Sequence, residues 1–325
     1  MAHIDTSPRL TIDLIREAHI RIAGKINRTP VLTSDTLDML AGGKLFFKCE
    51  NFQNVGAFKA RGATNAVFSL SDVEAAHGVA THSSGNHAAA LARAAKLRGI
   101  PAYIVMPENA PKAKQASVQR YGGDIILCAP TLEARESTAA GIVAKTGAAF
   151  IHPYNDLRVM AGQGTATIEL LDEVGELNLI LCPVGGGGLL SGTAVAACSL
   201  KPGIRVIAVE PDGADDAYRS FKAGHVIPAS KPNTIADGLL TSLGDKTFAE
   251  IQRYVDDIVT VSDDAIVYAM RKIWEVMKII VEPSAALPLA AIVDNKLRVV
   301  GQRVGVLLTG GNLDLDRLPW SRRSP

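Results

Sequence analysis

Short, nearly continuous apolar runs alternate along the chain with longer segments in which apolar residues recur every three or four positions. The runs are rich in Val, Ile and Leu, which is typical of strands buried on both faces of a parallel sheet. The strands predicted in this way lie within residues 44–50, 78–84, 101–107, 123–130, 178–186, 205–211 and 303–311.

Helical spacing of apolar residues is found between these runs, in residues 88–99, 112–123 and 164–175. The first two stretches end in glycine, as helix C-caps often do. The alternation of strands and helices predicts an α/β fold with open, mostly parallel, twisted sheets and helices on both faces. The 325 residues are enough for about two domains, but no repeat, linker or shift in composition marks a border between them.

The composition excludes several classes of protein. With 47% hydrophobic and 21% charged residues, the chain is not a disordered one. Lys and Arg number 34 against 33 Asp and Glu, so there is no electrostatic case for nucleic acid or an anionic membrane as partner. No apolar run approaches the ~20 residues of a membrane span, and the N-terminus is unlike a signal peptide. We therefore expect a cytoplasmic protein.

Cysteine usage gives no sign of a metal cluster or a disulfide framework. Cys49, Cys128, Cys182 and Cys198 are far apart and form no CxxC pair. The last residues, 321–325, are polar and are expected to fray.

Three glycine-rich segments follow predicted strands, where ligands bind in α/β sheets. Gly185–Gly188 precede a helical stretch, so their N–H groups can curl around a phosphate, although a tight turn is the alternative. The segment lacks the lysine of a P-loop and the acid of a dinucleotide fold, which disfavours NTP and NAD. Residues 82–87 (HSSGNH) suit a small anion such as a carboxylate, or merely cap a helix. Residues 309–312 (TGGN) form the third segment, for which a strand-ending turn is the alternative to a ligand-binding role.

Lys59 favours the ligand-binding interpretation of all three segments over the structural one. It lies three residues after Gly56 and opens an apolar helical stretch, a position that favours partial burial. Burial lowers the pKa of an amine, and a neutral amine can form a Schiff base. A solvated surface lysine is the alternative. A Schiff-base lysine, a phosphate cradle and a carboxylate loop are together what pyridoxal phosphate chemistry requires.

Four ordered motifs carry a family resemblance: residues 58–62 (FKARG), 83–87 (SSGNH), 185–188 (GGGG) and 309–312 (TGGN). From about residue 10 to 318 the chain resembles the fold type II (tryptophan synthase β-like) pyridoxal phosphate enzymes. Within them it is similar to the branch of serine racemases, serine/threonine dehydratases and 3-hydroxyaspartate ammonia-lyases. The resemblance implies a large cofactor-binding domain of residues 1–75 and 154–325 and a small mobile domain of residues 76–153. It also implies an active site between them and a homodimer.

The resemblance also implies roles around the cofactor. Lys59 would form the Schiff base and remove the α-proton of the substrate. Phe58 would pack on the pyridine ring, Asn86 would bond its phenolic oxygen, and Thr309 would face its nitrogen. A hydroxyl cannot protonate that nitrogen as an Asp would, and the weaker electron sink favours loss of a β-substituent. The implied phosphate ligands are Gly185, Gly186, Gly187, Gly188 and the N–H of Leu189.

Substrate contacts are implied in the same way. Those for the α-carboxylate are Ser83, Ser84, Asn86 and His87. In racemase-like members Ser84 is the acid on the face opposite Lys59, which keeps racemisation open beside a simple carboxylate or capping role. His82 and Arg135 would approach the distal end of a dicarboxylic ligand, although an exposed i,i+4 ion pair is the alternative for Arg135. Ser242 would lie near the β-hydroxyl, or cap a helix.

Residues 210–216 (EPDGADD) resemble the divalent-cation site of this branch. Glu210, the carbonyl of Ala214 and Asp216 would supply hard oxygen ligands for Mg²⁺, or for Ca²⁺ or Mn²⁺. A solvated acidic loop is the alternative.

The functional hypothesis is a pyridoxal phosphate ammonia-lyase that converts serine, threonine or 3-hydroxyaspartate to a 2-oxo acid and ammonia. One alternative is a serine racemase with side dehydratase activity. Another, from a different class, is a non-catalytic pyridoxal phosphate carrier or regulatory protein.

Overall fold

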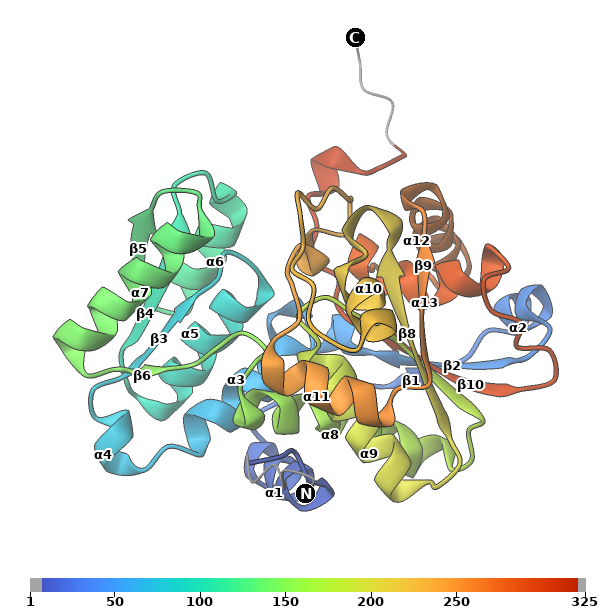
Figure 1. Ribbon diagram of the computed structural model, residues 1–325, viewed down its shortest axis with the longest axis horizontal. Helices are drawn as coiled ribbons and strands as arrows, with labels where there is room; N and C mark the ends of the chain where they lie inside the picture. The colour runs from blue at the N-terminus through green and yellow to red at the C-terminus, as the bar shows by residue number, and fades with distance from the viewer. Residues whose placement is uncertain (1–7, 321–325) are drawn as a thin grey trace, which may run out of the picture.

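The computed structural model describes residues 8–320 and shows two lobes, each built on one open sheet (Figure 1). The strands are β1 (Val31–Leu32), β2 (Lys44–Cys49), β3 (Val79–His82), β4 (Ala102–Pro107), β5 (Asp124–Cys128), β6 (Ala149–Phe150), β7 (Leu179–Pro183), β8 (Arg205–Pro211), β9 (Asp257–Val261) and β10 (Arg303–Leu308). The larger sheet has the order β1-β2-β10-β7-β8-β9 and the smaller one β5-β4-β3-β6. Only the pair of β1 and β2 is antiparallel in these two sheets of the described chain, which confirms the predicted mostly parallel fold.

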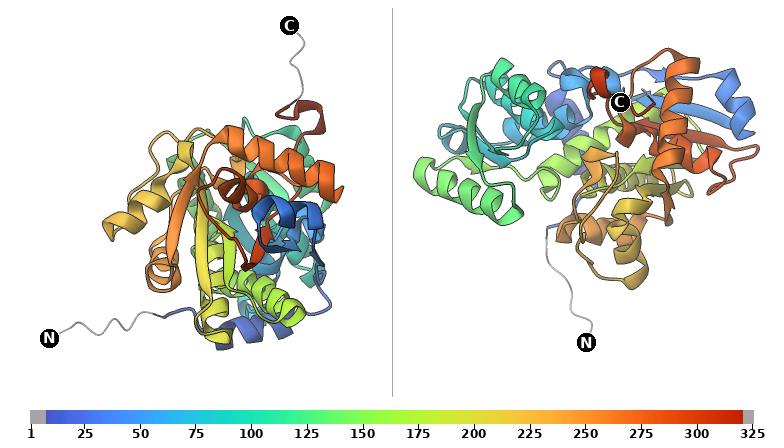
Figure 2. Two further views of the ribbon diagram at one scale, coloured as in Figure 1. Left: turned by 90° about the vertical axis from the view of Figure 1, so that its right-hand side faces the viewer. Right: turned by 90° about the horizontal axis from the view of Figure 1, so that it is seen from above.

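Helices cover both faces of each sheet (Figure 2). They are α1 (Ile12–Ile22), α2 (Asp35–Ala41), α3 (Lys59–Phe68), α4 (Asp72–Ala75), α5 (Asn86–Arg98), α6 (Lys112–Arg120), α7 (Leu132–Thr146), α8 (Leu157–Val174), α9 (Gly188–Leu200), α10 (Asp216–Ala223), α11 (Asp245–Tyr254), α12 (Asp263–Met277) and α13 (Pro283–Val293). Short 3-10 turns are η1 (Glu50–Phe52), η2 (Asn54–Gly56), η3 (Asp212–Ala214), η4 (Asp237–Leu239) and η5 (Leu315–Arg317).

The core of the large lobe explains why its strands read as continuous apolar runs. Successive side chains of a strand point to opposite faces of a sheet. In β7, Leu179 and Leu181 pack into the core formed with α12 and α13, whereas Ile180 and Cys182 pack into the core formed with α8 and α9. Because both faces are covered by helices, every position of the strand is apolar.

The smaller sheet is covered in the same way. In β4, Ile104 and Met106 pack with α5 and α3 on one face, whereas Val105 packs with Ala139 of α7 on the other. The strands of this sheet come from residues 79–150. That residues 76–153 move as one domain stays a prediction.

All seven predicted strands are present within the predicted ranges, whereas β1, β6 and β9, which lie at sheet edges, were not predicted. One predicted helix is longer than expected, since α8 begins at Leu157 instead of 164. Asp156 explains that start, because its side chain accepts a hydrogen bond of 2.8 Å from the Arg158 N–H and caps the helix. Residues 321–325, which were expected to fray, lie outside the described residues. No helix among the described residues is long and apolar enough to cross a membrane.

A buried cluster of charges joins β2, η1, α3 and α8. The guanidinium of Arg61, which is fully buried, donates to both oxygens of Glu50 at 2.7 and 2.8 Å and to both oxygens of Glu169 at 2.7 and 2.8 Å. Lys48 donates to Glu169 at 2.7 Å. The cluster thus pairs two cations with two carboxylates, and its geometry fixes the first turn of α3, where Lys59 lies.

Replacing Arg61 by Met should lower the free energy of unfolding by about 3–5 kcal/mol, because it leaves buried carboxylates without their main cation. Urea denaturation of the variant measures this. The matched control is Arg16→Met, since Arg16 forms an exposed ion pair of 3.4 Å with Asp13, and its loss should change stability by less than about 1 kcal/mol. Equal effects of the two substitutions would contradict the structural role of the cluster.

Candidate active site

A cavity of about 410 Å³ lies between the two lobes. Every side chain or glycine that the sequence predicted to bind cofactor or substrate lines it: Phe58, Lys59, His82, Ser83, Ser84, Asn86, His87, Arg135, Gly185, Gly186, Gly187, Gly188, Leu189, Ser242 and Thr309. The three predicted cation ligands lie elsewhere. Segments far apart in the sequence are therefore brought together as expected.

Lys59 is the first residue of α3 and its amine faces the cavity. The Nζ atom donates a hydrogen bond of 2.9 Å to the carbonyl of Pro153 and lies 5.1 Å from the centre of the Phe58 ring. Burial lowers the pKa of Lys59 to about 8, and no carboxylate in residues 8–320 forms a salt bridge with it. A large fraction of the amine is therefore neutral near pH 8, as a nucleophile or base must be.

The glycine loop between β7 and α9 presents its amides to the cavity. Its carbonyls are held by donors on the other side: Thr247 Oγ1 donates to Gly186 O at 2.9 Å, and Ser191 Oγ donates to Gly187 O at 2.8 Å. Within the described chain, the N–H groups of residues 185–189 have no backbone acceptor. Gly187 has φ +86°, which only glycine adopts readily. Free N–H groups at the start of a 13-residue helix make an anion cradle.

A second group of free amides lies at the start of α5. The backbone N–H groups of Ser84, Asn86 and His87 have no backbone acceptor in the described structure. The His87 side chain is buried, and neither ring nitrogen has a partner among the described residues. Burial holds the pKa of His87 well below its ordinary value, so the ring is neutral. A substrate carboxylate here would be bound by N–H and hydroxyl groups and not by a charged imidazole.

Glu282 is a site residue that the sequence analysis missed. It precedes α13, is 4% exposed, and lines the cavity. Burial raises the pKa of Glu282 to about 7. The sequence signal was a lone acid in an otherwise apolar stretch, residues 279–292. Burying a carboxylate in such a stretch is costly unless it has hydrogen-bond partners or a function.

Glu282 and Asn312 together fix the orientation of Asn86. The carbonyl of Val55 accepts a hydrogen bond of 2.7 Å from Asn312 Nδ2, which identifies that atom as the donor nitrogen. The same nitrogen donates to Asn86 Oδ1 at 3.0 Å, and Asn86 Nδ2 donates to Glu282 at 3.1 Å. One hydrogen of Asn86 Nδ2 is left for an acceptor in the cavity.

Arg135 reaches the cavity from α7 and forms no salt bridge within residues 8–320. Its Nε donates only a long bond of 3.4 Å to Thr131 O, so the alternative of an i,i+4 ion pair is not seen. His82 stacks on Phe150 at 5.5 Å, and burial together with the charge of Arg135 lowers its pKa. Ser242 Oγ accepts from the Ala229 N–H at 2.8 Å and so also holds its own loop.

The predicted cation ligands come from three successive elements: Glu210 lies near the end of β8, Ala214 ends η3, and Asp216 is the first residue of α10. Glu210 accepts hydrogen bonds from the N–H groups of Ala217 and Tyr218 at 2.9 and 2.7 Å, whereas neither carboxylate oxygen of Asp216 has a partner in the described chain. Burial raises the pKa of Glu210 to about 9 and that of Asp216 to about 6. Among residues 8–320, no three His, Cys, Asp or Glu side chains converge on a metal site.

Comparison with known proteins gives a consistent result. The family model described as pyridoxal-phosphate dependent enzyme matches residues 22–310. A beta-hydroxyaspartate dehydratase of Paracoccus denitrificans is 56% identical over 94% of this chain and 96% of its own length. A serine racemase of Arabidopsis thaliana is 52% identical over 94% of this chain and 93% of its own length. The structure of maize serine racemase superposes with a TM-score of 0.93 at 48% identity, covering 95% of both chains.

The residues of the cavity fit pyridoxal phosphate. The free amides of residues 185–189 suit its phosphate, and the Lys59 amine suits its aldehyde. The buried hydroxyl of Thr309, which has no partner in the described structure, suits its ring nitrogen. Among the described residues, the amides and the Thr309 hydroxyl have no hydrogen-bond partner, and the Lys59 amine bonds only a backbone carbonyl, which is what a site built for a ligand requires.

Covalent attachment of pyridoxal phosphate to Lys59 should accelerate about tenfold per pH unit below pH 8 and level off above it, because only the neutral amine reacts. Borohydride reduction of the cofactor-free protein at early times, followed by peptide mapping, measures the rate. The Lys59→Ala variant should show no label in the peptide that contains position 59. A rate that still rises tenfold between pH 8.5 and 9.5 would mean an unperturbed lysine, whose pKa is about 10.4.

Proposed function

The chain belongs to the pyridoxal-phosphate dependent enzymes, and we propose that it is an ammonia-lyase whose preferred substrate among 3-hydroxy amino acids is 3-hydroxyaspartate. The observation that carries the substrate choice is the guanidinium of Arg135, which lines the same cavity as Lys59 and forms no salt bridge within the described chain. A half-buried cationic group of this kind favours a ligand that brings a second carboxylate. Serine and threonine offer none.

The two ends of the substrate are assigned to different elements. The free N–H groups at the start of α5 would bind the α-carboxylate, as an anion at a helix N-terminus is favoured. Arg135, with the neutral His82 beside it, would bind the distal carboxylate. A dicarboxylic substrate is thereby held in one orientation, with its Cα toward Lys59.

Lys59 would act as the base at Cα. When bound, pyridoxal phosphate supplies a conjugated ring that accepts electrons from Cα and so lets the hydroxyl on Cβ leave. The amine of Lys59, with a pKa of about 8, can take and return a proton near neutral pH, and the Pro153 carbonyl holds it in place. The proton on Cα and the hydroxyl on Cβ are lost together as one water. One water is then consumed when the carbon–nitrogen bond is hydrolysed, so the products are oxaloacetate and ammonia.

The test is release of 2-oxo acid from L-serine, L-threonine and the 3-hydroxyaspartate isomers. We expect the highest kcat/KM with one hydroxyaspartate isomer. Arg135→Met should lower that value by about 10–150-fold, the worth of a hydrogen bond to a charged group, and should change the value for serine by less than about 3-fold. Arg120→Met, an exposed position on α6, is the control and should change neither.

Other outcomes reject the substrate or the reaction. A preference for serine over every hydroxyaspartate isomer would reject the role of Arg135. The second candidate, a serine racemase, is favoured by the position of Ser84 on the cavity wall and by the similarity to plant serine racemases. Formation of D-serine from L-serine faster than pyruvate release would put that candidate first. Bound cofactor with no change in its spectrum on adding any amino acid would indicate a carrier.

We further propose that Glu210, the Ala214 carbonyl and Asp216 bind a divalent cation. The support is the Asp216 carboxylate, which is 1% exposed and has no hydrogen-bond partner among the described residues. An unpaired buried carboxylate is costly, and a cation with oxygen ligands would compensate it. The position outside the cavity points to a structural or activating role.

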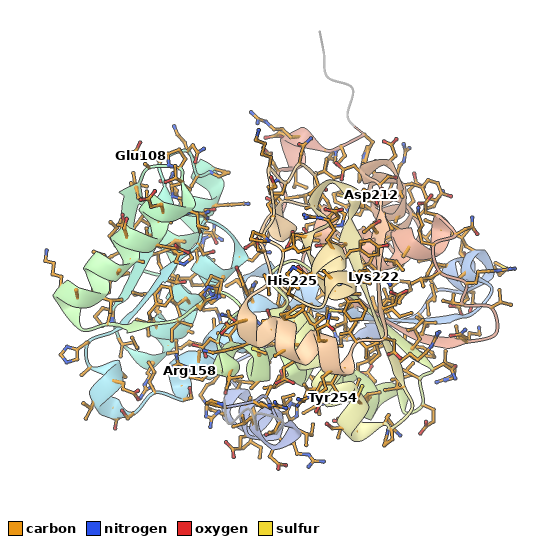
Figure 3. All side chains as sticks on the ribbon, viewed as in Figure 1. Glu108, Arg158, Asp212, Lys222, His225 and Tyr254 are labelled. Carbon is orange, nitrogen blue, oxygen red and sulfur yellow. The ribbon has the colours of Figure 1, made fainter. Side chains whose placement is uncertain are left out.

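A chelator should therefore lower the melting temperature of the protein, and Mg²⁺ or Ca²⁺ should restore it. Asp216→Asn should make the melting temperature insensitive to the chelator. Asp212→Asn, which removes an exposed acid of the same segment, should leave the sensitivity intact (Figure 3). If Asp216→Asn and Asp212→Asn respond alike, the cation does not bind here.

A further inference from the structure

Residues 152–155, which connect β6 of the small lobe to α8 of the large lobe, contact several parts of the cavity wall at once. The carbonyl of Pro153 accepts from Lys59 at 2.9 Å. The hydroxyl of Tyr154 lies 2.9 Å from Thr241 Oγ1. Asn155 Nδ2 donates to Asp245 at 2.6 Å. This segment thus contacts the lysine, the loop that holds Thr241 and the start of α11.

The ring of Tyr154 lies directly against the backbone of the glycine loop. A Cβ atom on Gly186 would lie closer than 3.0 Å to Cγ and Cδ1 of Tyr154, and one on Gly188 would lie 3.0 Å from the Tyr154 Cα and Cβ. Separations under 3.0 Å force one of the two groups to move. Glycine is therefore required at position 186 by the tyrosine ring, independently of any ligand.

The Tyr154 ring is itself held from other sides. The ring of His152 packs edge-on against it, with 4.5 Å between ring centres. Burial raises the pKa of the Tyr154 phenol, so its hydroxyl stays protonated and shares a hydrogen bond with Thr241. The loop has a further contact, since Thr247 Oγ1 donates to Gly186 O at 2.9 Å. The peptide at Gly186 is thus held by contacts with both Tyr154 and Thr247.

We propose that Tyr154 is a positioning residue for the phosphate of the cofactor. Its ring holds the backbone of residues 186–188 so that the free N–H groups converge on one point of the cavity. The inference rests on the proposed phosphate cradle, and it does not depend on which amino acid the enzyme converts. It adds to the cofactor assignment a distinction among the glycines of the loop. Gly186 is needed because of the Tyr154 ring, whereas other glycines are needed to expose N–H groups to the phosphate.

The test compares the affinity of the cofactor-free protein for pyridoxal phosphate and for pyridoxal, which lacks the phosphate. Tyr154→Ala should weaken binding of pyridoxal phosphate by about 10–150-fold, the range for a charge-assisted hydrogen bond, and that of pyridoxal by less than about 3-fold. Tyr254→Ala is the matched control, since Tyr254 is also half-buried but lies at the lower edge of the large lobe (Figure 3). It should leave the ratio of the two affinities unchanged.

A double substitution tests the contact itself. Gly186→Ala should weaken binding of pyridoxal phosphate strongly in the natural protein, because the new Cβ displaces the loop or the ring. In the Tyr154→Ala background the same change should cost less than about 3-fold, since the space is then empty, and the two effects are non-additive. Absorbance titration at a fixed pH gives all four affinities.

Two more conservative substitutions keep the proposal testable if the Ala variants fail to fold. Tyr154→Phe and Thr241→Val each remove the hydrogen bond and keep the volume, so each should weaken pyridoxal phosphate binding by about 2–10-fold, and the two together should do no more than either alone. Equal losses for pyridoxal and pyridoxal phosphate, or an undiminished Gly186→Ala effect in the Tyr154→Ala background, would overturn the proposal. Since binding is measured without turnover, these results are independent of the lyase assay.

Discussion

The position of Lys59 depends on the buried charge cluster that Arg61 forms with Glu50 and Glu169. Phe58 gives α3 no side-chain cap, so the first turn of this helix is held by the guanidinium of Arg61, three residues further on. Arg61 can satisfy its donors only when Glu50 of η1 and Glu169 of α8 approach together. Buried charges tolerate little displacement, because an unpaired one is costly. The cluster therefore fixes where the reactive amine stands relative to both β2 and α8.

The second constraint is that the cavity has walls from both lobes. Asn86 belongs to the small lobe, whereas Glu282 and Asn312, which orient its amide, belong to the large lobe. A salt bridge of 2.6 Å between Lys114 and Asp237 also joins α6 to η4 at the cavity wall. The donor pattern that faces the cavity thus exists only when the lobes are together, and neither lobe alone presents it.

Much of this could be predicted from the sequence, for physical reasons. Strands covered on both faces must be apolar throughout, so all seven long runs were visible, whereas β1, β6 and β9 are short or lie at sheet edges and carry a weaker signal. The motifs at residues 83–87, 185–188 and 309–312 follow strands of parallel sheets, and such ends gather at one place. Lys59 was predicted because it opens an apolar helical stretch, a position that favours burial, and because the glycine-rich segments supply the other groups that pyridoxal phosphate requires.

The sequence by itself therefore determined the α/β class, seven of the strands and the set of segments that meet at the cavity, because hydrophobic periodicity and short motifs are local properties of a chain. It could not show which neighbour each polar group or glycine meets. The sequence showed Glu282 only as a lone acid in an apolar stretch, and its role exists only because Asn86 and Asn312 converge on it. Likewise, Gly186 gives no sign in the sequence that Tyr154 occupies the space of its missing side chain. Such pairings join residues tens to hundreds of positions apart, so only the tertiary structure decided them.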